Sequence, residues 1–356
     1  MSRRSWSPVA ERWFSLTADD QREALEVAAA TTGLPAYLLE KDIWVVWALE
    51  ALGSDQHLLE TLTFKGGTSL SKAYGLIDRF SEDIDLTLDI RQLLPDVDMP
   101  PAPSNKKAKQ RKETVNTRLP QWVTEKPLPL LQKAAADVGL DISIIVNPDK
   151  KSVLELHYKP ILQAPSVGDP YVSPKVILEF GAHSTGEPHG PVEITCEAAK
   201  ALAGIAFPNA RPLVMDPRRT FWEKATAMHV FCCRGQWGKG DGARYARHWF
   251  DVDRMAIAGV AKTAMEDRPL ARQVADHKKD FWRSKDSANQ PIDYIAAISG
   301  SLQLVPTGEA FKALKADYVA MLDSGMLRDD PPQFDKLLER IAVLQEQCNA
   351  LARNNA

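Results

Sequence analysis

Two aspartates separated by a single residue are the first feature of this sequence that could do chemistry. Asp83 and Asp85 flank Ile84, and the alternation of apolar and polar residues over 84–88 predicts a β-strand. Residues two apart on a strand point to the same face, so the two carboxylates project together, about 6–7 Å apart. Such a pair can hold Mg²⁺, and without a cation one carboxylate tends to stay protonated. The simpler alternative is a solvated strand face, where most aspartates lie.

A glycine pair precedes these aspartates by about one helix. The segment 64–88 reads FKGGTSLSKAYGLIDRFSEDIDLTL. It predicts a strand over 61–64, a tight turn at Gly66-Gly67 and a helix over 69–77. Glycines let a backbone approach a ligand closely, and free N–H groups at the start of a helix can hold phosphate. The spacing is not that of a Walker A loop, but it favours a phosphate site facing the carboxylate pair.

A third carboxylate lies on another predicted strand. In the run KVILEFG over 175–181, alternation places Glu179 on the polar face. On a neighbouring strand, Glu179 would complete a metal-binding triad with Asp83 and Asp85. Two Mg²⁺ ions held there could clamp the attacking and leaving oxygens of a phosphoryl or nucleotidyl transfer. The alternative is an exposed acid at the end of a strand.

The densest match to a known family covers residues 65–86. KGGTSLSKAYGLIDRFSEDIDL resembles the signature of the AbiEii/AbiGii-type nucleotidyltransferase toxins, members of the polymerase-β-like nucleotidyltransferase superfamily. In that superfamily a G-[GS] turn and a helix precede a D-x-D strand, and a third carboxylate follows on a nearby strand. Weaker matches in the family order are Glu40-Lys41-Asp42, TFWEK at 220–224 and RHWFDVD at 247–253.

The resemblance implies a nucleotide site with a metal. The triphosphate of an NTP would be held by four consecutive residues, Gly66, Gly67, Thr68 and Ser69. The cofactor Mg²⁺ (or Mn²⁺) would be held by three carboxylates, Asp83, Asp85 and Glu179.

The resemblance also assigns Lys224 to a phosphate of the nucleotide. Thr220 and Glu223 form a capping box that predicts a helix through Phe231, with Lys224 in its first turn. A cation gains nothing from the helix dipole there, so a functional reason and a solvent-facing lysine in an unfavourable position both stay open.

Asp251 and Ser81 complete the expected site. Asp251 would be a further active-site acid that positions Lys224 or Arg247, or reaches the acceptor. An i,i+4 pair with Arg247 is the alternative, worth only about 0.3–0.5 kcal/mol. Ser81 could carry a hydrogen bond to a phosphate, and its simpler role is to cap the turn before the strand.

Two segments could bind RNA. Residues 95–120 begin with prolines, and 105–118 carry six basic residues against one acid, which predicts either a solvated, mobile insertion or an electrostatic arm for RNA or DNA. Residues 231–247 combine glycines, cations and aromatic rings. They suit a loop that grips a nucleotide or a single-stranded RNA end, or a flexible connection. The candidate contacts in this loop are Arg234, Trp237, Lys239, Arg244 and Tyr245.

The elements around these motifs predict an α+β fold: a polymerase-β-like nucleotidyltransferase core with a mixed sheet, N-terminal helices and a C-terminal helical domain. Capping at Thr17 predicts a helix that ends at Gly33, and a second apolar helix covers 36–52. Further strands are expected at 141–146, 153–158 and 176–180, and further helices at 121–138, 244–260, 311–323 and 332–352. The expected domains are 1–60, 61–215 and 216–356.

Composition limits the class of protein. The 356 residues are 44% apolar and 26% charged, with a net charge of −3, so RNA binding must rely on local patches. Four cysteines without a C-x-x-C pair, and a trio His183, His189 and Cys196 without zinc-ligand spacing, argue against a disulfide scaffold or a zinc site. With no apolar run of membrane length, we expect a cytoplasmic protein.

The expected function is therefore a Mg²⁺-dependent nucleotidyltransferase toxin of a toxin–antitoxin or phage-defence system. The resemblance implies transfer of NMP from an NTP to an RNA acceptor, with tRNA expected, release of pyrophosphate, and a cognate antitoxin as partner. The alternatives are transfer to a protein or a small molecule, and a catalytically decayed member of the fold that only binds partners.

Overall fold

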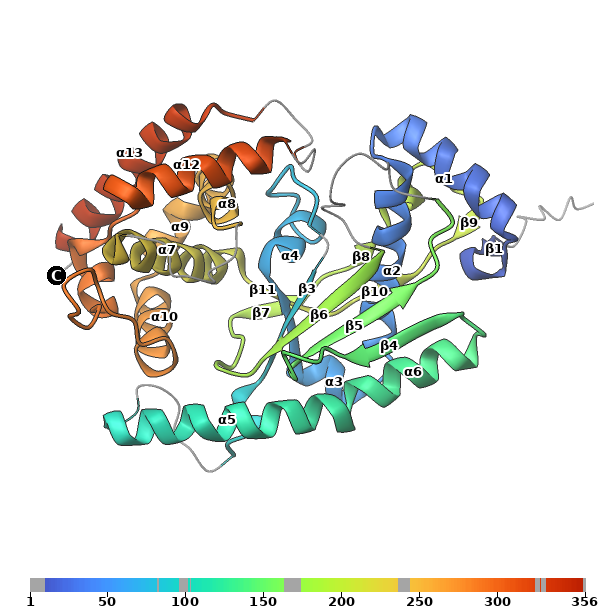
Figure 1. Ribbon diagram of the computed structural model, residues 1–356, viewed down its shortest axis with the longest axis horizontal. Coiled ribbons are helices and arrows are strands. Elements are labelled where there is room, and N and C mark those ends of the chain that lie inside the picture. The colour runs from blue at the N-terminus through green and yellow to red at the C-terminus, as the bar shows by residue number, and fades with distance from the viewer. Residues whose placement is uncertain are drawn as a thin grey trace, which may run out of the picture.

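A mixed β-sheet lies at the centre of one half of the protein (Figure 1). The computed structural model describes residues 10–81, 83–95, 102, 104–162, 174–235, 244–323, 327 and 331–354. Within them the sheet has seven strands in the order β4-β5-β6-β3-β2-β11-β7. Their bounds are Ile142–Val146 (β4), Val153–Tyr158 (β5), Lys175–Gly181 (β6), Ile84–Leu88 (β3), Leu62–Lys65 (β2), Leu213–Met215 (β11) and His189–Pro191 (β7).

Both strand directions occur in this sheet, as expected. β3 pairs with β6 in parallel, as does β11 with β2, and the other pairs are antiparallel. Two small two-stranded ladders flank the sheet: β1 (Glu11–Arg12) with β9 (Ile205–Ala206), and β8 (Ile194–Thr195) with β10 (Asn209–Ala210). The expected α+β class with a mixed sheet is confirmed.

The N-terminal helices follow the sequence signals closely. They are α1 (Ala18–Thr32), α2 (Ala36–Leu52) and α3 (Gln56–Thr61). The Thr17 side chain accepts a hydrogen bond from the Asp20 amide, and Gly33 ends α1 in the left-handed conformation, φ +73°. Most of α2 is buried, since it packs against the sheet and against α1.

Helices make up most of the described residues from 217 onward, and they gather on one side of the molecule (Figure 1). They are α7 (Pro217–Arg234), α8 (Ala246–Ile257), α9 (Val260–Glu266), α10 (Arg268–Phe281), α11 (Tyr294–Ala296), α12 (Gly308–Asp323) and α13 (Phe334–Asn354). The sequence signals predicted α8, α12 and α13 but missed α10. No helix in the described ranges is both long and apolar enough to span a membrane.

Apolar burial is organised in two clusters. One combines the sheet with α1, α2, α5 and α6, and the other combines α7–α13 with Leu70 and Ile77. Two tryptophans of the second cluster are almost fully buried, and their indole N–H groups donate to carbonyls: Trp222 to Ala264 at 2.9 Å and Trp249 to Leu304 at 2.8 Å. The predicted domain limits at 60 and 215 stay predictions.

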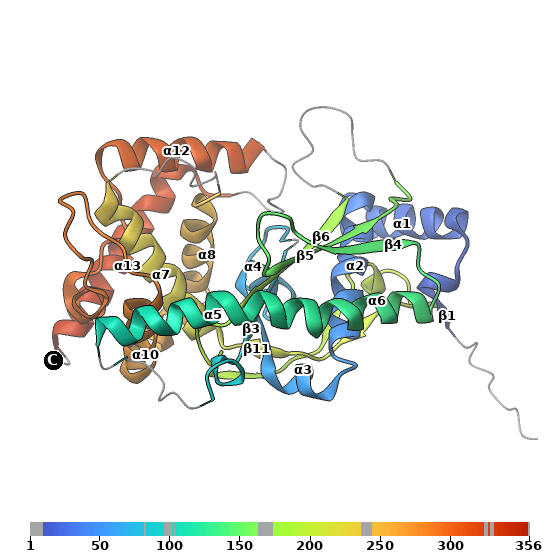
Figure 2. The ribbon, with the colours of Figure 1, turned by 60° about the horizontal axis from the view of Figure 1, so that its bottom comes forward.

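The basic segment is a helix, not a mobile insertion. Residues 105–125 form α5 (Asn105–Glu125), capped by Ser104 and followed by α6 (Pro127–Asp137). Its buried residues recur every three or four positions: Ala108, Arg111, Val115, Leu119 and Val123. The buried Arg111 pairs with Asp280 of α10 at 3.4 Å. The helix thus lies across both the helices and the sheet (Figure 2), and the expectation of a mobile segment is wrong for 104–120.

Two helix boundaries differ from expectation for identifiable reasons. α4 spans Gly66–Lys72, not 69–77, because Gly75 adopts φ +59° and the Leu76 amide donates back to the Leu70 carbonyl. α7 begins at Pro217 with Asp216 as its cap, so Thr220 lies inside the helix. Lys224 is therefore in the second turn, and the helix-dipole argument for its function is wrong.

Candidate active site

A cavity of about 330 Å³ lies between the sheet and helices α7, α8 and α10, and we call it the carboxylate cavity. It brings together segments far apart in the sequence. Its lining residues are Lys65, Gly66, Gly67, Arg79, Ser81, Asp83, Asp85, Glu179, Thr220, Glu223, Lys224, Ala227, Arg244, Arg247, His248 and Lys278. Seven of the residues expected in the site are among them: Gly66, Gly67, Ser81, Asp83, Asp85, Glu179 and Lys224.

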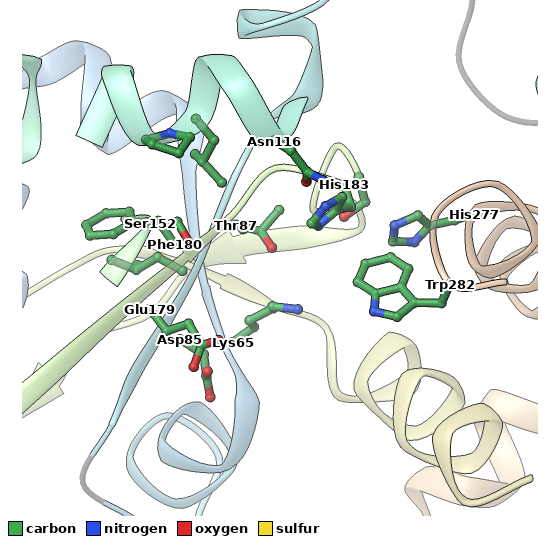
Figure 3. Close-up of a pocket in the computed structure, with 15 residues that line it drawn as sticks. Lys65, Asp85, Thr87, Asn116, Ser152, Glu179, Phe180, His183, His277 and Trp282 are labelled. Atoms are coloured by element: carbon green, nitrogen blue, oxygen red, sulfur yellow. The ribbon is translucent and has the colours of Figure 1, made fainter. Parts of the chain in front are cut away.

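Three neighbouring strands hold the charged floor of this cavity. Asp85 of β3 lies opposite Lys65 of β2 and opposite Glu179 of β6 in the strand registers. Figure 3 shows these three side chains together at one end of the sheet. Burial raises the pKa of Asp85 to about 6; Lys65 opposes the rise, while Glu179 and Asp83 add to it. The sheet thus concentrates negative charge that a cation would compensate.

The donor set fits a hard divalent cation. Carboxylate oxygens are the protein ligands that Mg²⁺ prefers, and Mg²⁺ usually takes one or two of them together with substrate phosphates and water. In the part of the chain that the structure describes, no three His, Cys, Asp or Glu side chains are gathered tightly enough to hold a metal by themselves. A cation here would therefore share Asp83 and Asp85 with a phosphate, and the assignment of these residues and of Glu179 as ligands stays a prediction.

Gly66 and Gly67 must be glycines because neighbouring side chains occupy the space that a Cβ atom would need. Gly66 has φ +79°, and a Cβ on it would overlap the Asp85 carboxylate. A Cβ on Gly67 would overlap the guanidinium of Arg79 and come within 2.9 Å of the Ser81 hydroxyl. The glycines thus allow the carboxylate and the guanidinium to lie directly against the backbone that begins α4.

Thr68 and Ser69 point away from the cavity. Both are fully buried. The Thr68 hydroxyl donates to the Asp83 carbonyl at 2.5 Å and contacts the Ser81 hydroxyl at 2.9 Å, while Ser69 donates to the Gly66 carbonyl at 3.0 Å. Their side chains hold the turn in shape, so their predicted contact with the triphosphate would have to come from their backbone amides.

Asp251 lies behind the cavity wall and holds two of its cations. It is fully buried, and its carboxylate accepts from Arg79 at 2.7 and 2.8 Å and pairs with Lys224 Nζ at 2.9 Å. Burial opposes its ionisation, but Arg79 and Lys224 outweigh that effect and hold the pKa of Asp251 well below its usual range. The geometry fits the predicted positioning of Lys224, and full burial is incompatible with direct contact to an acceptor.

A second ionic group is centred on Glu223, another residue that lines the cavity. Glu223 lies between Lys65 at 3.3 Å and Arg219 at 3.2 Å. Burial opposes ionisation here too, but Lys65, Arg219 and Lys278 keep the pKa of Glu223 well below its ordinary value. Burial lowers the pKa of Lys278 to about 8, against the effect of Glu223 and assisted by Lys65 and Arg219. Lys278 is therefore a cation whose charge changes near neutral pH.

Several polar groups of the cavity lack protein partners or are held under strain. The buried Oγ1 of Thr220 and Nδ1 of His248 have no hydrogen-bond partner in the described protein, which is uncommon without a ligand or water. Arg244 adopts φ +110°, held by Asp317, which accepts from the amides of Arg244 and Ala246, both at 2.7 Å. These features favour a polar ligand in the cavity.

The glycine-rich segment is described only at its ends. Trp237 and Lys239 lie outside the described residues. Arg244 lines the carboxylate cavity, whereas Arg234 and Tyr245 line an adjoining cavity of about 210 Å³. The Tyr245 ring stacks on Phe231 with 5.7 Å between centroids.

Some lining residues were not singled out from the sequence. Lys65, Arg79, Thr220 and His248 stood inside matched motifs without an assigned role in the site. Lys278 belongs to α10, whose apolar residues Leu270, Ala271, Val274 and Ala275 do follow a helical stripe. From that stripe α10 could have been predicted, and with it the wall of the cavity that contains Lys278.

Comparison with known proteins identifies the family of this chain. A family model described as "Nucleotidyl transferase AbiEii toxin, Type IV TA system" matches residues 47–340, a range that contains every residue lining the carboxylate cavity. No curated protein matches the chain. Among solved structures the chain is similar to MenT4, a nucleotidyltransferase toxin from Mycobacterium tuberculosis H37Rv, with 16% identity and a TM-score of 0.38 over 95% of this chain and 99% of that one. The family match establishes that the chain belongs to the AbiEii nucleotidyltransferase toxins of type IV toxin–antitoxin systems.

Proposed function

We propose that this toxin transfers a nucleoside monophosphate from an NTP to an RNA acceptor, with tRNA as the expected RNA, and that Mg²⁺ is the metal used. Family membership implies the NTP and an antitoxin partner. The observation that carries the proposal is the carboxylate cavity, which Asp83, Asp85 and Glu179 line together with the cations Arg79, Lys224 and Lys278. Carboxylates for a metal and cations for phosphates, gathered in one cavity, suit a metal-bound polyphosphate.

The chemistry is an in-line displacement. A hydroxyl oxygen of the acceptor forms a bond to the α-phosphorus, and the bond from that phosphorus to pyrophosphate breaks. Mg²⁺ bound at Asp83 and Asp85 would supply charge neutralisation on the phosphates. Lys224, held by Asp251, would bind a phosphate oxygen. Lys278 adds charge to the same wall.

An RNA acceptor is favoured by the exposed face of α5. Lys109, Lys112 and Asn116 are spaced i, i+3 and i+7, so they share one face of the helix. All three are exposed, and Asn116 lines a cavity next to the carboxylates. A protein of net charge −3 needs such a local basic face to bind a polyanion.

The test is incubation of the protein with each α-labelled NTP and total RNA, with Mg²⁺, with Mn²⁺, or with EDTA. We expect label in RNA with one or more NTPs, and none with EDTA. Asp83→Asn and Asp85→Asn should abolish labelling while the apo protein keeps or gains thermal stability, because one of several like charges is removed. Label that enters only protein or small molecules contradicts the RNA acceptor, and wild-type turnover in either variant contradicts the carboxylate assignment.

A further inference from the structure

A second cavity adjoins the carboxylate cavity and is unlike it in chemistry. It measures about 370 Å³, within the usual range of ligand pockets, and we call it the histidine cavity. It shares Lys65, Asp85 and Glu179 with the carboxylate cavity. Its other described lining residues include His183, His277, Trp282 and Asn116 (Figure 3).

Two imidazoles form one side of the histidine cavity, and both are neutral. Burial lowers the pKa of His183 to about 4, and Lys65, Lys112 and Lys278 add to the effect. Burial likewise holds the pKa of His277 well below its ordinary value, although Glu223 opposes this. Among the described lining residues, charge is therefore confined to the three that both cavities share.

Within the described residues, His277 lacks hydrogen-bond partners that a polar ligand could supply. The residue is only 5% exposed, and neither Nδ1 nor Nε2 has a hydrogen-bond partner in the described protein. A neutral imidazole has one donor and one acceptor nitrogen, and buried polar atoms are seldom left unpaired. The ring points into the cavity toward His183 in Figure 3, so a ligand there can supply the missing partners.

The ligand best suited to this wall is flat and uncharged. Trp282 is 39% exposed and meets the rings of His183 and His277 edge to face, with centroids 4.7 and 5.0 Å apart. Asn116 adds a side-chain amide, which has two N–H donors and one carbonyl acceptor. Aromatic surfaces beside mixed donor and acceptor groups are typical of sites for an unstacked nucleobase.

The position of the cavity fits the reaction. In-line displacement needs the attacking hydroxyl on the side of the α-phosphorus opposite to pyrophosphate. The carboxylate cavity has the cations for a triphosphate, and the histidine cavity meets it at Asp85 and Glu179. Outside, Lys112 and Lys109 continue from Asn116 along the same face of α5, where phosphates attached to a nucleoside would lie.

We infer that the histidine cavity is the acceptor site of the enzyme and binds the terminal nucleoside of an RNA strand, with His277 and Asn116 bonded to its base. This inference rests on the proposed transfer to RNA. The terminal hydroxyl oxygen bonds to the α-phosphorus of the NTP in the carboxylate cavity, pyrophosphate leaves with the broken bond, and the hydroxyl proton passes to one of the shared carboxylates.

The experiment measures kcat/KM for short single-stranded RNAs that differ only in their terminal nucleoside. Asn116→Ala changes an exposed side chain, and Gln110→Ala is its control on the same helix, also exposed and away from both cavities. His277→Phe keeps the ring contacts and removes both nitrogens. We expect Asn116→Ala and His277→Phe to lower kcat/KM for RNA by roughly tenfold and to reduce the preference among terminal nucleosides, with Gln110→Ala unchanged. The dissociation constant for NTP should not change in any of them.

A binding readout separates this inference from the proposed function. Fluorescence anisotropy of labelled RNA on the Asp83→Asn protein should show weaker binding when Asn116→Ala is added. If wild-type enzyme labels RNA but neither Asn116→Ala nor His277→Phe changes acceptor kcat/KM or RNA binding, the acceptor site lies elsewhere and the inference fails alone. If RNA is never labelled and the label enters protein, the proposed RNA acceptor fails, and this inference fails with it. Should His277→Phe not fold, Asn116→Ala decides.

Discussion

Asp251 of α8 reaches Lys224 of α7 at 2.9 Å, and the same carboxylate binds Arg79 from the segment between α4 and β3. One fully buried acid thus fixes two cations of the carboxylate cavity. Removal of the acid would leave both cations without their partner, and loss of one partner from a buried pair typically costs about 3–5 kcal/mol.

Asp251→Asn should therefore lower the free energy of unfolding by about 3–5 kcal/mol at pH 7, measured by urea denaturation. The pKa of Asp251 is depressed in the folded protein, so its stabilisation is present above the ordinary pKa and is lost as pH falls through the folded value. The variant should accordingly lose less stability than wild type on acidification. Asp253→Asn is the control, because Asp253 is buried and pairs with Arg340, away from the cavity. A variant as stable as wild type would contradict the structural role.

Lys224→Met should keep the Arg79–Asp251 pair and fold, but lower kcat/KM for NTP, because a phosphate contact is lost. Steady-state kinetics with varied NTP provides the measurement. Lys262→Met, on the exposed surface of α9, is the matched control. Unchanged kinetics in Lys224→Met would return this residue to a purely structural role.

Gly66→Ala should abolish transfer, because the added Cβ displaces the Asp85 carboxylate. Gly75→Ala separates this effect from backbone strain. Gly75 also has a positive φ, but no atom lies within 4 Å of the place that a Cβ on it would take, so its substitution should cost only about 1–2 kcal/mol and leave activity intact. Equal activity losses in the two variants would show that strain, not displacement of Asp85, is responsible.

Activity should decline as pH rises through about 8, because Lys278 loses its charge there in the free enzyme. Burial is the main cause of the lowered pKa of Lys278; Glu223 opposes it, and Lys65 and Arg219 assist it. The Lys278 ammonium also lies 4.7 Å from the centre of the Trp282 ring. The pH profile of kcat/KM for NTP tests this. Lys278→Arg keeps its charge at every accessible pH, so its profile should lack the alkaline decline. If the alkaline decline of kcat/KM persists in Lys278→Arg, a group other than Lys278 causes it.

Lys109→Gln with Lys112→Gln should reduce the salt dependence of RNA binding. Each phosphate contact to a single strand contributes about −0.7 to the slope of log affinity against log salt, so two lost contacts should change the slope by about 1.4. Both side chains are exposed, so the helix should remain folded. The control is Lys312→Gln with Lys336→Gln on α12 and α13, helices that lie apart from α5 in Figure 1. Equal slope changes in both pairs would indicate only a net-charge effect.

Much of the fold could be predicted from signals that involve only residues close together in the sequence. The Asp83–Asp85 strand, the cap at Thr17 and the end of α1 at Gly33 depend on neighbours within a few residues, and they occur where expected. The strand alternation also placed Glu179 correctly, because β6 pairs with β3 in the register that brings it to Asp85.

The features that could not be predicted from the sequence depend on contacts between residues far apart in the chain. The buried face of α5 contains Ala108 and Arg111, which do not look like core residues, and the buried charge of Arg111 is paired with Asp280 of α10. The Asp251 partner is likewise 172 residues away, at Arg79, beyond any local pattern. The wall formed by His277 and Trp282 was missed because α10 itself was not recognised.

The buried Arg79–Asp251 pair also bears on how ligands enter. It ties the segment between α4 and β3 to α8, and so fixes the chain that leads into the sheet against the C-terminal helices. Separation of this segment from α8 would pull two buried opposite charges apart, which costs several kcal/mol. Ligands should consequently pass through the mouths of the cavities and not through a hinge between the halves. In stopped-flow mixing, the observed rate of NTP binding should then rise linearly with concentration, without the plateau that a slow opening step would impose.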